Sequence, residues 1–288
     1  MSDLNVLYLL KHCNLDCTYC YEKSTRTVEK MNKETAQQHI DFILSHMPTN
    51  EQASILLFGG EPMLNWDVFI FCIQYIYDNY FLKGRNVHVS TVTNATLLKP
   101  ERVRQLFKYN KLFSIHISID GDRETTNVNR KFKSGVGAYD IIAKNIPHIL
   151  MYFPLSIARM VVTQDSINKF YDNVVHLNKV FGFRHFCFQS EHGIIHDPEY
   201  LELWNSQMQK IQEFLSSIPG GRINEVQPPR THEEYHKHAE EAKKSDRLYR
   251  YYLPDKDVVV QKIYVEADFQ HFNKGANADY NLSKGGQS

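Results

Sequence analysis

The sequence has no excess of charge of either sign and no long apolar run. Its 288 residues include 33 Lys and Arg and 33 Asp and Glu, so the formal net charge is zero. Without a basic block there is no source for the phosphate attraction that drives nucleic-acid binding, and we expect no nucleic-acid partner. The first apolar run, "LNVLYLL", is far shorter than the roughly 20 residues that span a bilayer, and no basic segment precedes it. We therefore expect a soluble, cytoplasmic protein with no membrane partner.

Cysteine is also scarce. The chain has five cysteines, and three of them lie together in "CNLDCTYC", at positions 13, 17 and 20. An odd number and such close spacing do not suit a disulfide framework, so a reducing compartment fits best. The scarcity makes the cluster informative, because a chain that seldom uses cysteine has concentrated it at the end of its first strand-like run.

Hydrophobic residues are plentiful, at 42% of the chain, and they fall into an alternating pattern. Short runs rich in β-branched and aromatic residues predict strands at 5–10, 53–58, 86–93, 112–119, 155–162 and 183–189. Segments with helical spacing of apolar residues predict helices near 33–47, 65–80, 99–109, 137–150, 167–181 and 198–217. This alternation predicts an α/β fold, a partial (βα)6 barrel of parallel strands joined by right-handed crossovers.

The composition changes after residue 217. The breakers "PGG" and "PPR" precede a polar stretch of mixed charge, 231–252, which we expect to be helical, and a last predicted strand at 257–266. We therefore divide the chain into a barrel at 1–217, a short C-terminal extension at 218–272 that is a candidate substrate-binding element, and a flexible tail at 273–288.

The spacing C-x3-C-x2-C allows three thiolates to converge on one soft metal centre, either an iron-sulfur cluster, zinc or copper(I). Zinc requires a fourth ligand, and His12 is poorly placed for it because it is adjacent to Cys13. Three thiolates on a four-iron cluster would leave one iron open to a small molecule. From this motif alone, structural zinc and ordinary buried thiols remain alternatives to an iron-sulfur site.

Read together with the motifs that follow, the cysteines resemble those of the radical S-adenosylmethionine (SAM) enzymes. The signature of that family is C-x3-C-x-aromatic-C after the first strand, and Tyr19 stands at the aromatic position. The other motifs come in the family's order, "FGGEP" at 58–62, "TVTNATLL" at 91–98, "SIDG" at 118–121 and then Arg130 in "NVNRKF". Each follows a predicted strand, and parallel barrels build their sites at the carboxyl ends of strands. The resemblance covers about residues 3–190.

The resemblance implies that Cys13, Cys17 and Cys20 bind one [4Fe-4S] cluster, whose open iron chelates SAM. It implies that the Gly-Gly-Glu segment holds the amino group of SAM, and glycines there would let backbone carbonyls approach a ligand without a Cβ in the way. It also implies that Arg130 pairs with the methionyl carboxylate, for which its planar fork is suited. The full set of implied cofactor-binding residues is Tyr19, Gly59, Gly60, Glu61, Thr93, Asn94, Ser118, Asp120, Arg130, Arg159 and Val161.

Further roles follow from the same resemblance. Ser118 and Asp120 would contact the ribose or the methionyl group, and Arg159 with Val161 would flank the adenine. One position departs from the family pattern, because Ala95 stands where the family usually has Gly. If that residue requires positive φ, alanine is strained there, and otherwise the turn differs from the usual one.

The stretches "SIDGDRETTNVNR" and "GVGAYDIIAKNI" resemble the branch of the family that modifies peptides and proteins, which includes the anaerobic sulfatase-maturing enzymes. That branch usually carries the additional cysteine motifs of a SPASM or Twitch extension. Here Cys72 and Cys187 are the only cysteines outside the signature, and two thiolates cannot hold a conventionally ligated second cluster. We therefore expect a single cluster.

Cys187 lies toward the end of the sixth predicted strand, where a side chain on the inner face would point into the barrel. It is a candidate hydrogen-atom donor, as in peptide epimerases, and the alternative is an ordinary buried thiol. Gln189, Glu191 and His192 follow on the rim and are candidate substrate contacts.

The resemblance implies an enzyme that cleaves SAM reductively and abstracts hydrogen with the resulting 5′-deoxyadenosyl radical. The expected substrate is a ribosomally made peptide, modified by a reaction such as epimerisation or crosslinking. The electron would come from an external one-electron reductant such as flavodoxin or ferredoxin. Two alternatives remain: a radical SAM enzyme acting on a small molecule (an amino acid, sugar or nucleoside), and a non-enzymatic zinc or iron-sulfur binding module.

Overall fold

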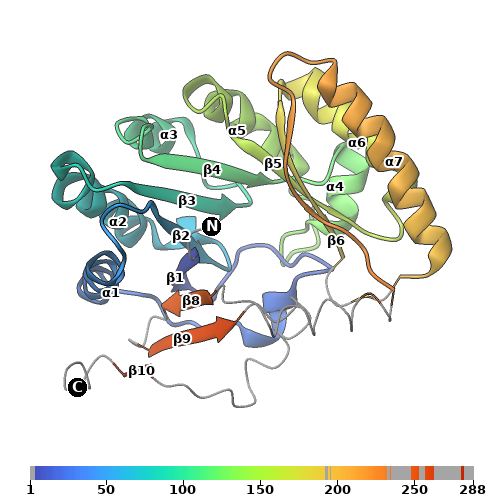
Figure 1. The fold of residues 1–288 in the computed structure, drawn as a ribbon. Coiled ribbons are helices and arrows are strands. Elements are labelled where there is room, and N and C mark those ends of the chain that lie inside the picture. Colours follow the sequence, from blue (N-terminus) through green and yellow to red (C-terminus); the bar gives the residue numbers. More distant parts are fainter. Residues whose placement is uncertain are drawn as a thin grey trace.

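A single curved sheet forms the centre of the protein in the computed structural model, which describes residues 4–191, 194, 196–231, 234, 248–252, 257–262 and 280–281 (Figure 1). Its strand order is β10-β9-β8-β1-β2-β3-β4-β5-β6-β7. Strands β1 to β7 are parallel and follow the order of the sequence, β8 lies parallel to β1 on its other side, and β9 and β10 are antiparallel to their neighbours. The sheet is therefore an open arc and not a closed barrel.

The strands are β1 (Leu4–Leu10), β2 (Ala53–Gly59), β3 (Val87–Thr93), β4 (Phe113–Ser118), β5 (Ile157–Val162), β6 (His185–Ser190), β7 (Arg222–Gln227), β8 (Leu248–Tyr252), β9 (Asp257–Lys262) and β10 (Tyr280–Asn281). The α-helices are α1 (Lys33–His46), α2 (Trp66–Asn79), α3 (Pro100–Phe107), α4 (Arg123–Asn129), α5 (Tyr139–Tyr152), α6 (Phe170–His176) and α7 (Pro198–Ser216). Short turns of other helix types are η1 (Tyr21–Thr25), η2 (Pro62–Asn65), η3 (Phe81–Lys83), η4 (Ile167–Lys169) and η5 (Leu177–Phe181).

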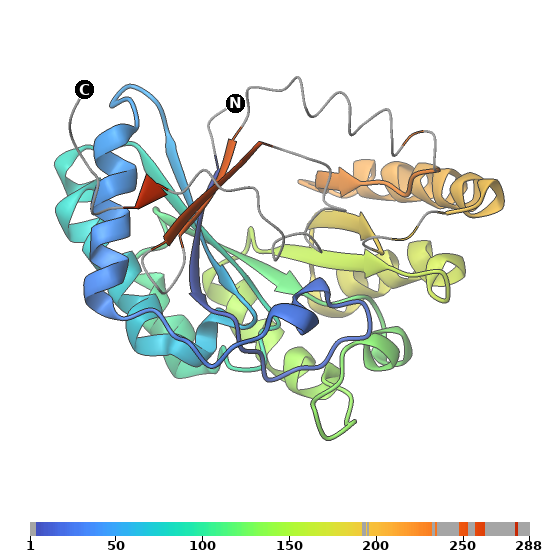
Figure 2. The ribbon, with the colours of Figure 1, turned by 90° about the horizontal axis from the view of Figure 1, so that it is seen from below.

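The two faces of the sheet differ because side chains alternate along a strand. In β2 and β3, every second residue is buried against the helices and the residues between are half-buried. The buried set on β3, for example, includes Val87 and Val89, while His88 and Ser90 face the concave side. Figure 2 shows the helices along the outer side of the curved sheet. The apolar core thus lies between sheet and helices, and the inner face is left to more polar side chains.

The predicted α/β fold with a parallel sheet is confirmed. All six predicted strands exist within two residues of their expected limits, and the expected helices are present, although the one predicted at 167–181 is divided into η4, α6 and η5. The count of six parallel strands was too low, since β7 continues the sheet beyond β6. Its sequence, "RINEVQ", was missed because it is mostly exposed and lacks a hydrophobic alternation.

The region after residue 217 differs from expectation where it is described. The predicted helix over 231–252 is wrong at its end, because residues 248–252 form β8 beside β1. The reason is tertiary: Tyr252 is buried against α1, and its hydroxyl donates to Asn5 Oδ1 at 3.3 Å. The strand predicted at 257–266 is present as β9, and of the tail at 273–288 only Tyr280–Asn281 lies within the described residues. Within the described part of the chain, no helix is both long and apolar enough to cross a membrane.

Candidate active site

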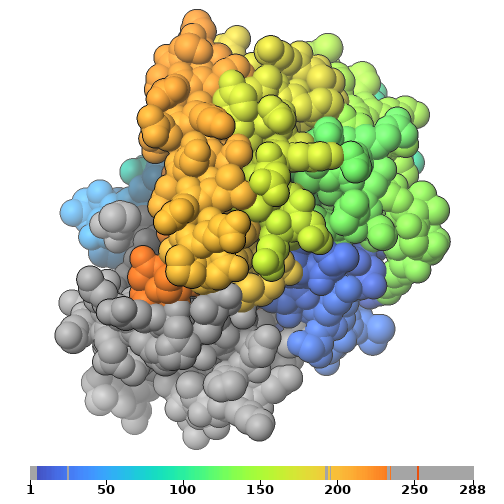
Figure 3. Space-filling model, turned by 90° about the vertical axis from the view of Figure 1, so that its right-hand side faces the viewer, coloured from blue at the N-terminus to red at the C-terminus, as the bar shows by residue number. Residues whose placement is uncertain are grey.

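The cysteine-containing loop leaves β1 and crosses the carboxyl ends of the strands. Cys13 and Cys17 are buried and Cys20 is partly exposed. The loop is fixed to the segment after α4, since Asp16 N donates to Lys131 O at 2.7 Å and Thr18 N donates to Asn129 O at 3.0 Å. Figure 3 shows this contact from outside, with the blue N-terminal loop beside the green segment. Two regions more than 100 residues apart in sequence therefore form one surface around the thiols.

Gly59 and Gly60 allow β2 to end directly against the same loop. A Cβ on Gly59 would lie 2.0 Å from Leu10 O, and one on Gly60 would lie 2.4 Å from His12 O. The glycines are therefore required by the close approach of two backbone segments of this chain. This differs from the reason proposed from the sequence, which was room for a ligand.

Glu61 connects the end of β2 to the end of β3. Its carboxylate is fully buried and accepts hydrogen bonds from Thr93 Oγ1 at 2.7 Å, Asn94 N at 2.8 Å and Met63 N at 3.1 Å. Burial raises the pKa of Glu61 to about 7, although the three donors act in the opposite direction. In this arrangement the carboxylate holds two strand ends together.

The turn after β3 reaches back to the first cysteine. Asn94 Nδ2 donates to Asn14 Oδ1 at 3.0 Å and lies 3.9 Å from Cys13 Sγ. Ala95 in this turn has φ of 58°, which makes it the one non-glycine residue with positive φ among those the structure describes. Ala95 therefore adopts the left-handed conformation that suits glycine, which costs about 1–2 kcal/mol.

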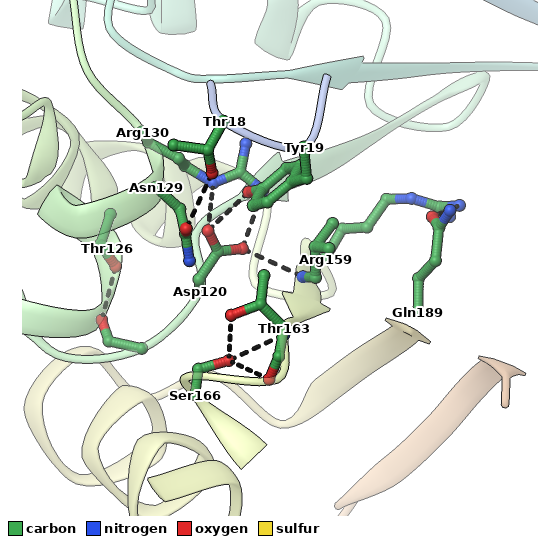
Figure 4. A network of polar contacts seen from close by, with 12 residues as sticks. Thr18, Tyr19, Asp120, Thr126, Asn129, Arg130, Arg159, Thr163, Ser166 and Gln189 are labelled. Atoms are coloured by element: carbon green, nitrogen blue, oxygen red, sulfur yellow. Dashed lines mark hydrogen bonds and ion pairs between the residues drawn. The ribbon is translucent and has the colours of Figure 1, made fainter. Parts of the chain in front are cut away.

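Asp120 is the centre of a buried polar network (Figure 4). Its carboxylate accepts two hydrogen bonds from Arg130, at 2.9 Å each, and one from the Tyr19 hydroxyl at 2.6 Å. It also accepts from Val161 N at 3.0 Å. The paired carboxylate raises the pKa of Arg130, while burial raises that of Tyr19. Asp120 thus joins β4, β5 and the loop of the cysteines, and the fork of Arg130 is directed at Asp120.

A second polar group lies on the inner face of β5, β6 and β7. Arg159, Cys187 and Glu225 occupy adjacent register positions on these strands. Arg159 Nη1 binds Glu225 Oε2 at 3.1 Å, and Nη2 donates to Gln189 Oε1 at 3.2 Å, so this side chain is directed away from Asp120 (Figure 4). Cys187 lies between the two charged partners and is 2% exposed. Because Cys187 pairs in register with Arg159 and Glu225, its side chain lies on the inner face of the sheet, the orientation that the sequence predicts.

Three other predicted residues lie near this rim. Ser118 ends β4 beside Arg159, and Val161 lies half-buried on the same face of β5. Glu191 follows β6, and burial raises the pKa of its carboxyl. His192 lies outside the described residues.

The cysteine loop has the donor chemistry of an iron-sulfur site. Burial raises the pKa of Cys13 to about 12 and also raises that of Cys17, so the thiols would release protons on binding metal. Among the described residues, no three His, Cys, Asp or Glu side chains are close enough together for one metal ion. A cluster places each thiolate on a different iron, so its ligands are spread further apart than those of one ion. The three thiols fit a cluster in this respect.

Three residues that line these sites were missed from the sequence. Arg26 lies against the cysteines, Glu225 lies on the unpredicted strand β7, and His116 faces the inner side of β4. Burial, aided by Arg159, lowers the pKa of His116 to about 4, and its buried Nδ1 has no hydrogen-bond partner. A basic residue shortly after the third cysteine was the one visible signal, since the other two depend on strand register.

Sequence comparison identifies a family and several relatives. The model of the radical SAM superfamily matches residues 7–172. A protein of Methanocaldococcus jannaschii, MJ0907, is 32% identical over 49% of this chain and 49% of its own length. A cysteine-type anaerobic sulfatase-maturating enzyme of Clostridium perfringens is 27% identical over 59% of this chain and 45% of its own length. The chain thus spans about half the length of these curated relatives.

Solved structures share the fold. Streptococcus suis SuiB, bound to its precursor peptide SuiA, superposes with a TM-score of 0.67 at 15% identity, over 98% of this chain and 62% of SuiB. The enzyme anSMEcpe, with bound AdoMet and the Cp18Cys peptide, superposes with a TM-score of 0.63 at 22% identity, over 77% of this chain and 63% of its own. At these identities the likeness concerns the fold alone.

Proposed function

This chain belongs to the radical SAM superfamily, and from that premise we propose that it is a SAM-cleaving enzyme that abstracts hydrogen from a ribosomally made peptide. The observation that carries the proposal is the convergence of the cysteine loop with the strand-end motifs. Gly60, Glu61 and Asn94 contact this loop from one side, Glu61 through a hydrogen bond from its N to His12 O at 3.0 Å. Tyr19 and Asp120 link it to β4 and β5 from the other.

Cys13, Cys17 and Cys20 would hold one four-iron cluster, and the strand-end residues would bind SAM next to it. When bound, the cluster supplies the electron that cleaves SAM to methionine and a 5′-deoxyadenosyl radical, which takes a hydrogen atom from the substrate. The chain's own residues hold the loop rigid through Asp120 and bury two of the thiols, which keeps water from the reacting atoms. In this proposal Arg130 meets the SAM carboxylate with the edge of its guanidinium that does not face Asp120.

Two observations support a peptide as the substrate. The sulfatase-maturating relative acts on a protein by its name, and SuiB and anSMEcpe are described with bound peptides. In this chain, the exposed strand β7 belongs to the extension at 218–272 and brings Glu225 beside Cys187. We therefore propose that this extension contributes to substrate binding, with Gln189, Glu191 and His192 as further contacts.

Cys187 is the proposed hydrogen-atom donor. Its S–H bond would break as a C–H bond forms at the substrate radical, and the resulting thiyl radical would take one electron from the external reductant and one proton. Since Cys187 is 2% exposed and lies between Arg159 and Glu225, the substrate must separate these partners before it reaches the sulfur. Burial also raises the pKa of Cys187 to about 11, which keeps the sulfur protonated as a donor must be.

The test is anaerobic reconstitution with iron and sulfide. We expect about four irons per chain, a brown colour and 5′-deoxyadenosine after addition of SAM and dithionite. Cys17→Ala should abolish all three, while Cys72→Ala, a buried cysteine on α2, should retain them. A colourless protein that binds one zinc would overturn the proposal in favour of a zinc module.

The substrate class is tested by adding candidate precursor peptides in deuterated solvent. Deuterium at one α-carbon would indicate epimerisation, and a loss of two hydrogens would indicate crosslinking. Cys187→Ala should stop deuterium uptake but leave the cleavage of SAM intact. If SAM is cleaved and no peptide changes mass, whereas an amino acid, sugar or nucleoside does, the substrate is a small molecule.

A further inference from the structure

Arg26 returns from the end of η1 to the loop of the cysteines. Its Nη2 donates to Cys20 Sγ at 3.6 Å, and its Nη1 lies 3.3 Å from Asp16 Oδ1. The side chain is only 14% exposed, and its buried Nε has no hydrogen-bond partner. A guanidinium carries three nitrogens around a permanent charge, so this residue presents an incompletely satisfied cation to the thiols.

The Arg26 guanidinium contacts the loop of the cysteines directly at Cys20. Because the Arg26 side chain is largely buried, its charge is little screened by water. Arg130 is also buried near the loop, but the Asp120 carboxylate accepts from two of its nitrogens and neutralises much of its charge. Arg26 therefore places a fixed positive charge beside the thiols that would carry the negative charge of a bound cluster.

A purely structural role does not account for this placement. The carboxylate that Arg26 contacts belongs to Asp16, which is 47% exposed and is already paired with Lys23 Nζ at 3.2 Å. An ion pair with an exposed carboxylate stabilises a protein little. Placing a largely buried guanidinium with an unpaired Nε beside the Cys20 thiol is costly, so the compensating anion is to be sought on the sulfur side.

We propose that Arg26 is a positioning and charge-tuning residue for the iron-sulfur cluster, an inference that rests on the proposed function. One electron from a low-potential donor adds one negative charge to the cluster and its three thiolates. A cation fixed beside them stabilises this reduced state relative to the oxidised one, because the added charge increases the attraction. Arg26 therefore raises the reduction potential of the cluster. Its hydrogen bond to Cys20 Sγ also holds that side chain in place within the loop.

The test is a redox titration of the reconstituted protein, followed by electron paramagnetic resonance of the reduced cluster. At a fixed potential we expect Arg26→Gln to lower the ratio of reduced to oxidised cluster about tenfold, which corresponds to about 59 mV for a one-electron couple. Arg26→Lys keeps the charge and should restore most of this ratio. The readout is independent of any substrate.

Lys23→Gln is the matched control. It removes the same charge from the same loop and from the same carboxylate partner, but Lys23 is exposed and its ammonium lies on Asp16. Its effect on the ratio should be a small fraction of that of Arg26→Gln. Asp16→Asn should shift the ratio in the opposite direction, because it removes the carboxylate that partly neutralises Arg26.

The outcomes separate this inference from the proposed function. If the wild-type protein binds no cluster, the proposed function fails. If the wild-type cluster forms and cleaves SAM but Arg26→Gln leaves the ratio unchanged, or Lys23→Gln lowers it equally, the inference about Arg26 alone is overturned. If Arg26→Gln holds no cluster, Asp16→Asn decides: a higher ratio supports the proposal and an unchanged ratio overturns it.

Discussion

Two arginine–carboxylate pairs of the site lie in very different surroundings. The strand-end network, formed by Tyr19, Asp120 and Arg130, has its ion pair at 2.9 Å with the Asp120 side chain 0% exposed. The inner wall, formed by Arg159, Cys187 and Glu225, has its ion pair at 3.1 Å with Glu225 45% exposed. Both side chains of the first pair are buried, whereas the Glu225 side chain of the second pair is exposed to solvent.

This difference indicates different roles. Asp120 satisfies its oxygens with four hydrogen bonds from within the chain, so it stabilises one arrangement of the loop, β4 and β5. Glu225 accepts hydrogen bonds from Arg159 at 3.1 Å and Gln227 at 2.8 Å, both of which lower its pKa despite burial, and because its side chain is 45% exposed, water or a ligand can replace these partners. We infer that the strand-end network fixes the cofactor site and that the inner wall adapts to the substrate.

The largest effect is expected from Asp120→Ala, which leaves Arg130 buried without its anion. Removing one partner of a buried pair costs about 3–5 kcal/mol. Denaturant unfolding of the apoprotein should show this loss, and iron content after reconstitution should fall. Asp120→Asn, which keeps the shape and some hydrogen bonds, should lose less. If Asp120→Ala lowers the free energy of unfolding by less than about 1 kcal/mol, the buried pair contributes no more than an exposed pair, and the strand-end network does not differ from the inner wall in this respect.

A pH-dependent effect is expected from Glu61, whose pKa is raised to about 7 in the folded state. Between about pH 4.5 and 7 the folded protein binds more protons than the unfolded chain, so the free energy of unfolding falls as pH rises through this window. The expected contribution is about 3 kcal/mol. Glu61→Gln should lack it, and the difference between the two unfolding curves should decline from about pH 4 to about pH 8. Parallel curves would contradict the raised pKa.

Gly60→Ala tests the approach of β2 to the cysteine loop. The added Cβ would meet the carbonyl of His12, and we expect a cost of about 1–3 kcal/mol together with reduced iron content. Gly84→Ala is the control: Gly84 has φ of 84° and no atom within 4 Å of the point where a Cβ would lie, so it should cost about 1–2 kcal/mol from backbone strain alone. Equal iron contents in the two variants would show that the contact at Gly60 does not position the cysteines.

The smallest effect on stability is expected from Glu225→Gln. Its ion pair is partly exposed, so the free energy of unfolding should change by less than about 1 kcal/mol. The rate of peptide modification should change by a larger factor than the rate of SAM cleavage without peptide, since Glu225 lies beside Cys187. Equal changes in both rates would place Glu225 outside the substrate site.

The strands that could be predicted from the sequence are those whose apolar residue pattern results from burial of one face. Strands β1 to β6 have one face in the core, and their apolar runs gave limits within two residues of those observed. Strand β7 is polar because it lies exposed, and β8 was misassigned as helix because Tyr252 became a core residue only through contact with α1. The sequence of a short polar segment does not show which strands it will pair with or how exposed it will be.

The site shows the same division. The three cysteines, the order of the motifs and their placement at strand ends could be predicted, because those depend on residue type and local pattern. The partners of these residues could not be predicted, because they are set by the fold: Glu61 binds the next strand end, Arg130 binds Asp120, and Arg159 binds Glu225. The physical reason is that hydrogen bonds and ion pairs depend on the distance between atoms from separate strands, and the curvature and register of the sheet set these distances.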